Sequence, residues 1–139
     1  MGKVDLLTNT LQPETGSSGS VGIPVIIAGL TGTAKFDSDA STGNKGVPVL
    51  VVSFTVPAGY QRDLQQVMLS SSVSGKMEIK IGPNIIGSKR TAPGNPNIDF
   101  KFWPAHPISA GETVEVRFTA TNQSGSDVEA YVQSTERPI

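Results

Sequence analysis

The sequence contains no cysteine and only one histidine. Disulfides, thiolate metal sites and cysteine nucleophiles are therefore excluded. A catalytic triad or a histidine metal site would have to use His106, the single histidine. No stretch is apolar for long enough to cross a bilayer, since the longest apolar run, 47–52, is short and contains Pro48. The first residues lack the apolar core of a signal peptide, and we expect a soluble protein made in a cytoplasm, without membrane contact.

An excess of charge of one sign is also missing. The chain has 11 basic and 12 acidic residues, and the basic ones are scattered along the sequence. Nucleic-acid binding proteins gather lysine and arginine into a patch or stripe. We therefore expect no direct binding to DNA or RNA.

What the chain does contain is the pattern of β-structure. In the segment 113–120, Val114, Val116, Phe118 and Ala120 alternate with polar residues. Successive side chains of a strand point to opposite faces, so this segment is predicted to be a half-buried strand of an antiparallel sheet. The 15 glycines and 10 prolines suit a fold with many turns.

The same alternation recurs along the chain and predicts an all-β fold. Candidate strands cover 21–28, 47–56, 60–72, 75–82, 98–103 and 127–133. Short strands at this spacing are typical of a sandwich or barrel. We expect a two-sheet antiparallel β-sandwich and favour a jelly roll, with an immunoglobulin-like sandwich as the alternative. Residues 1–20 are interpreted as a flexible N-terminal arm, and 21–139 as a single sandwich domain.

Three details of this prediction can be checked. Leu50, Val52, Phe54 and Val56 should share one face of their strand, and the apolar Val49 and Val51 on the other face predict that its first half is covered on both sides. The apolar positions change parity between Leu64 and Val67, which predicts a β-bulge near Gln65 and Gln66. The polar stretches 29–46 and 87–96 are expected to be loops.

Few residues suggest chemistry. His106 lies between two prolines, and no nucleophile motif accompanies it. Asp37 and Asp39 could hold calcium in a loop, but the further acidic ligands are missing. Glu78, Asp99, Glu115 and Glu129 occupy the polar face of their strands, as solvated residues do. We therefore predict no catalytic, metal or cofactor site, and no enzyme activity.

Three aromatic residues suggest an alternative to a protein without a binding site, namely a site for sugars. Trp103, Tyr60 and Tyr131 could form a platform on which sugars stack. Trp103 has the opposite parity to Ile98 and Phe100, so it is either exposed or packed at a strand end. A single tryptophan more often serves packing or an interface.

Several segments together resemble a known family. They are FTVPAG at 54–59, GKMEIKIG at 75–82, FKF at 100–102 and PISAGE at 107–112, followed by VEV at 114–116, TN at 121–122 and VEAYV at 128–132. Over residues 47–134 the chain is similar to the small jelly-roll capsid cement or decoration proteins of tailed bacteriophages. Such turns and strands also occur in baseplate and fibre domains.

The resemblance implies a virion structural protein on the capsid surface, where it bridges subunits of the major capsid protein without a cofactor. Proteins of this kind form dimers or trimers and use extended arms. The residues expected to contact a partner are Val4, Leu6, Leu7, Leu11, Phe36 and Trp103. The alternative function is a carbohydrate-binding module of a tail fibre or baseplate protein.

Overall fold

The computed structural model describes residues 24–27 and 30–139, which form nine strands and no helix. The predicted all-β class is confirmed. The arm predicted for 1–20 lies outside the described residues. The strands are β1 (Pro24–Ile27), β2 (Leu30–Gly43), β3 (Val49–Thr55), β4 (Tyr60–Ser71), β5 (Gly75–Ile81), β6 (Asn84–Arg90), β7 (Asn97–Ile108), β8 (Thr113–Ala120) and β9 (Ser126–Pro138).

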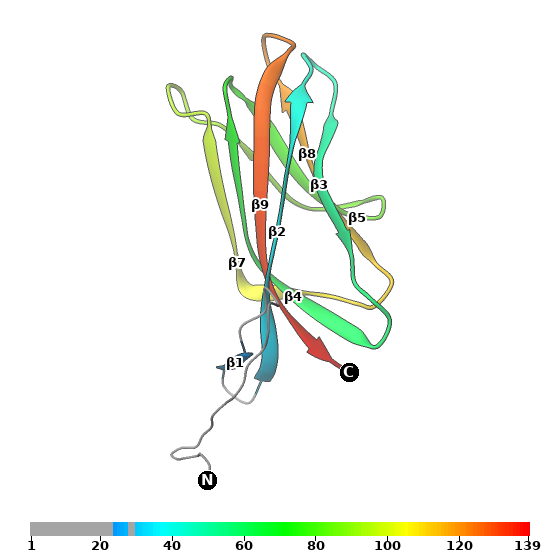
Figure 1. Cartoon of the computed structure of the whole chain (residues 1–139). Coiled ribbons are helices and arrows are strands. Elements are labelled where there is room, and N and C mark those ends of the chain that lie inside the picture. The colour runs from blue at the N-terminus through cyan, green and yellow to red at the C-terminus, as the bar shows by residue number, and fades with distance from the viewer. Residues whose placement is uncertain (1–23, 28–29) are drawn as a thin grey trace.

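The strands build two antiparallel sheets that pack face to face (Figure 1). The first sheet has the order β1-β2-β9-β4-β7, and the second has the order β3-β8-β5-β6. The pairs β2–β9, β3–β8, β4–β7 and β5–β6 are nested, as in one long antiparallel ribbon wound around a barrel. This winding is the jelly roll, so the favoured topology is confirmed and the immunoglobulin-like alternative is excluded.

The core lies between the sheets and follows from the alternation in the sequence. On β8, Val114, Val116, Phe118 and Ala120 are fully buried, as predicted. From the neighbouring strand β5 of the same sheet come Met77 and Ile79, and from β9 of the opposite sheet come Val128, Ala130 and Val132. Burial of each large apolar side chain contributes about 1.5–3 kcal/mol.

The register shifts at three places in the described strands, in β3, in β4 and between β5 and β6, and the first two bear on the sequence predictions. The register of β4 shifts between Leu64 and Gln66, so the predicted bulge is confirmed, and Leu64 and Val67 both face the core. A second shift lies between Leu50 and Val52 of β3. It buries both Val51 and Val52 and leaves Leu50 exposed, so the prediction that Leu50 shares a covered face with Val52 was wrong. The extra residue of a bulge reverses the alternation, and Val51 supplies it here.

One of the two predicted polar loops is largely a strand, and the other is a strand only in its first part. Most of 29–46 belongs to β2, which pairs with β9 from Thr33↔Glu136 to Gly43↔Ser126. Of 87–96, only 87–90 belong to the edge strand β6, which pairs with β5, whereas 91–96 form the predicted loop before β7. Polar composition did not prevent strand formation, because the partner strands supply the backbone hydrogen bonds while many of the side chains face solvent.

Candidate functional site

The outward face of the first sheet carries exposed apolar side chains in neighbouring positions. The cross-strand register places Ser38, Tyr131, Met68 and Asp99 in one row across β2, β9, β4 and β7. Directly opposite residues share a face of the sheet, so Tyr131 and Met68 lie side by side. Phe36 is opposite Gln133, one diagonal step from Tyr131, at about 7–8 Å by sheet geometry.

Trp103 extends this face at the β7 edge. Its side chain is 95% exposed, against 60% for Phe36, 46% for Tyr131 and 42% for Met68. Asp99, Lys101 and Trp103 are exposed at alternating positions, so Trp103 continues the outward parity of β7. We call Phe36, Met68, Trp103 and Tyr131 the aromatic face. A wholly exposed indole is unusual in a folded protein, and tryptophan is enriched among the anchors of protein interfaces.

The neighbouring residues of β7 hold Trp103 outward. Gln66 of β4 pairs with Lys101, whereas Leu64 pairs with His106, so residues 102–105 arch past the bulge in β4. Phe102 points back toward the core, with its ring centroid 5.0 Å from Phe100 and 5.9 Å from His106. Packing on the inner side of the arch therefore presents the indole to solvent.

The outward face of the second sheet is more highly charged, although Leu50 and Ile85 are exposed on it. Lys76 pairs with Glu78 at 3.4 Å, and Arg117 pairs with Glu115 at 3.0 Å. These are ordinary solvated ion pairs, as the sequence predicted for Glu78 and Glu115. The larger set of exposed apolar side chains, including the exposed tryptophan, is on the first sheet.

A shallow hollow of about 440 Å³ opens beside Tyr131 and Met68. Its lining comes from three neighbouring strands and the loop before β7: Met68, Leu69, Ser70, Asn95, Asn97, Ile98, Asp99 and Tyr131. Hydrogen bonds fix several of its polar atoms. Ser70 Oγ lies 2.9 Å from Asn97 Oδ1, and Gln66 Nε2 donates to Asp99 Oδ1 at 2.6 Å.

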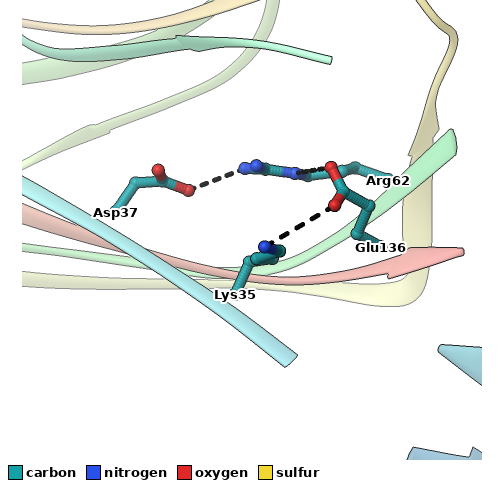
Figure 2. A network of polar contacts seen from close by, with 4 residues as sticks. All are labelled: Lys35, Asp37, Arg62 and Glu136. Carbon is teal, nitrogen blue, oxygen red and sulfur yellow. Dashed lines mark hydrogen bonds and ion pairs between the residues drawn. The ribbon is translucent and has the colours of Figure 1, made fainter. Parts of the chain in front are cut away.

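An ion network lies at one end of the sandwich, on the inner side of the first sheet (Figure 2). Arg62 is buried and donates to Asp37 Oδ2 at 2.7 Å and to Glu136 Oε2 at 3.1 Å. Lys35 Nζ approaches Glu136 at 3.7 Å, and the Arg62 guanidinium stacks 4.4 Å from the Phe54 ring centroid. The network joins β2, β4 and β9 to β3 and closes the core, which indicates a structural role.

The candidates for chemistry are not brought into a site. Asp37 and Asp39 both lie on the strand β2 and not in a loop. Asp37 bonds to Arg62 in the ion network, and Asp39 accepts a hydrogen bond from the Ala40 N–H, so the two do not form a calcium loop. His106 packs beside Phe102. Within 24–27 and 30–139, no three histidine or acidic side chains are grouped to hold a metal ion. The same residues include no helix that could span a membrane.

Only two of the six predicted contact residues belong to the described part of the chain. Val4, Leu6, Leu7 and Leu11 lie outside the described residues. Phe36 and Trp103 are exposed on one face, although on strands at opposite sides of it, β2 and β7.

The predicted aromatic platform does not form. Tyr60 pairs with Pro138 at the far end of β4, eight residues from the position opposite Tyr131, which is about 26 Å along a strand. Sequence reasoning missed Met68 and the hollow. Met68 could have been found, because it is an apolar residue on the polar parity of β4, between Val67 and Leu69.

Comparison with known proteins does not assign the chain to a family. No family model matches the sequence, and no curated protein matches it.

Proposed function

We propose that this protein is a virion structural protein, a capsid cement or decoration protein of a tailed bacteriophage, and that its aromatic face docks on the assembled shell. In this role it bridges neighbouring subunits of the major capsid protein and performs no catalysis. It would act on the capsid surface after synthesis in the host cytoplasm. The observation that carries the proposal is the wholly exposed Trp103 on the same sheet face as the exposed Phe36, Met68 and Tyr131.

The size of the face supports docking on a broad protein surface. Four strands about 4.8 Å apart and about 12 residues long make a face of roughly 19 by 40 Å, or about 760 Å². A standard protein interface buries about 800 Å² on each partner. One sheet face can therefore supply a complete interface.

The composition of the face also supports this role. Interfaces combine a few aromatic anchors with polar residues that contribute little energy. Gln66, Gln133 and Ser38 supply such neutral polar surroundings here. A shell presents many identical copies of its surface, so modest individual contacts gain through avidity if the protein forms the expected dimer or trimer.

The test is co-sedimentation of purified protein with capsid shells of the same virus. Full-length protein should bind at a fixed ratio and raise the temperature at which the shells disrupt. Trp103→Ala should weaken binding by about 30-fold, the loss expected for an anchor worth about 2 kcal/mol. Removal of residues 1–20 tests the arm, and the truncated protein should bind shells more weakly than the full-length protein.

Lys80→Ala is the matched control, because Lys80 lies on the outward face of the second sheet. It should bind like the unaltered protein. Absence of binding by the full-length protein would refute the proposed function. Equal weakening by Trp103→Ala and Lys80→Ala would refute the assignment of the docking face.

A further inference from the structure

We propose that the hollow between β4, β7 and β9 binds a neutral sugar, one or two residues of a glycan. This binding site is separate from the proposed function, since it concerns a small ligand and is tested on the protein alone. It also differs from the platform predicted from the sequence, because neither Trp103 nor Tyr60 lines it.

The size and position of the hollow suit a small ligand. Its volume of about 440 Å³ lies within the range of ligand sites, about 300–1,000 Å³. The walls come from paired strands of one sheet, so their spacing is fixed by backbone hydrogen bonds. A ligand would meet a site that is already formed, which lowers the entropic cost of binding.

The polar lining offers donors and acceptors together. Asn97 Oδ1 lies within hydrogen-bonding distance of Ser70 Oγ, and Asn95 Oδ1 accepts the backbone N–H of Asn97 at 3.1 Å. These bonds occupy the amide oxygens. Among the described residues, no hydrogen bond uses the two amide nitrogens or Asp99 Oδ2. Amide N–H donors beside a carboxylate acceptor match the hydroxyl groups of a sugar, each of which both donates and accepts.

The apolar lining completes this match. Tyr131 and Met68 are exposed beside the polar groups, and an aromatic ring can pack against the C–H face of a sugar. The Tyr131 hydroxyl bonds to Glu129, and this bond raises the pKa of Tyr131 above its ordinary value of 10.0. The ring therefore stays neutral at physiological pH.

The charge around the hollow favours an uncharged ligand. Asp99 is the one charged residue in the lining. Lys89 donates to the Asp99 backbone oxygen at 3.0 Å, and Lys101 follows two positions along β7. Glu129, which accepts the Tyr131 hydroxyl and lies opposite Ser70, adds a second carboxylate. The two carboxylates and the two lysines balance each other, so neither an anion nor a cation has an electrostatic advantage.

The test is a titration of the purified full chain followed by amide NMR, with glucose, galactose, mannose and N-acetylglucosamine as separate probes. We expect at least one sugar to shift the amide signals of Asn95, Asn97, Asp99 and Tyr131. A dissociation constant of about 1 mM would be typical for so small a ligand. The absence of saturable shifts with all four probes would overturn the proposal.

Two variants locate the site, and one serves as a control. Tyr131→Ala removes the exposed aromatic ring, and Asp99→Asn replaces the acceptor with an amide of the same size. Each should weaken sugar binding at least tenfold. Trp103→Ala should leave it unchanged, because Trp103 lies four residues beyond Asp99 on β7, about 13 Å along the strand. Binding that survives Tyr131→Ala, or that needs Trp103, would place the sugar elsewhere and overturn the inference.

The two proposals can fail independently. The sugar titration contains no shells, and the shell experiment contains no sugar. If both hold, the sugar should compete with shells, because Met68 and Tyr131 belong to the hollow and to the aromatic face.

Discussion

Replacing Arg62 with alanine should destabilise the fold far more than removing an arginine from an exposed ion pair. The Arg62 side chain is only 9% exposed, and it makes charge-assisted hydrogen bonds to Asp37 and Glu136. Its guanidinium also stacks on Phe54. The substitution removes all three contacts and leaves two carboxylates without their shared cation.

The magnitude follows from the burial of each partner. Breaking a fully buried ion pair costs about 3–5 kcal/mol. Asp37 is 29% exposed and can be hydrated, and Lys35 remains 3.7 Å from Glu136, so the loss here should be smaller. The stacking on Phe54 adds about 1 kcal/mol. We expect Arg62→Ala to lower the free energy of unfolding by about 2–4 kcal/mol, and the melting temperature by roughly 10 °C.

Urea unfolding followed by circular dichroism measures this loss. Tryptophan fluorescence is a poor probe here, because Trp103 is already exposed in the folded state. The matched control is Arg117→Ala, which removes a pair to Glu115 whose two side chains are each about 30% exposed. An exposed pair of this kind is worth about 1 kcal/mol or less. A loss for Arg62→Ala no greater than that for Arg117→Ala would refute the structural role of the network.

Gly75→Ala should lower the free energy of unfolding by about 1–3 kcal/mol, because the added Cβ would overlap the Phe118 ring and the Thr119 carbonyl. Thermal unfolding beside the exposed neighbour Ser74→Ala, which should change little, measures this, and equal stability of the two variants would contradict it. Glu129→Gln should bring the raised pKa of Tyr131 back toward its ordinary value, because the carboxylate is the main cause of the shift. The stabilising effect of this contact is fully present below the ordinary pKa of tyrosine and disappears as the pH rises through the raised pKa. An NMR titration of the Tyr131 ring checks this, and an unchanged pKa in the variant would contradict it.

The fold was predicted well where burial is one-sided and regular. Val114, Val116 and Phe118 of β8 alternate with polar residues, and the structure buries all three. The bulge in β4 was also visible, because it shifts the apolar positions from one parity to the other. The prediction failed for Leu50, since Val51 and Val52 are both apolar and the pattern does not show which residue is the extra one.

The long strand β2 could not be predicted from its own composition. Its polar residues resemble a loop, and only pairing with β9 makes them a strand. The ion network has the same origin, because Arg62 and Glu136 are far apart in the sequence and meet through the β4–β9 register. The exposed Trp103 was one of two outcomes left open by its parity.

The sequence by itself determined the all-β class, the sandwich and most of the core, because the period-two alternation of apolar residues requires a sheet with one buried face. It also determined that no cysteine chemistry is available. Only the tertiary structure decided which side chains share the outward face of the first sheet. Strand order and register place Tyr131 beside Met68 and move Tyr60 to the far end, and both depend on pairings between residues distant in the chain. Local patterns carry no information on such pairings, so the aromatic face and the hollow appear only when the sheets are assembled.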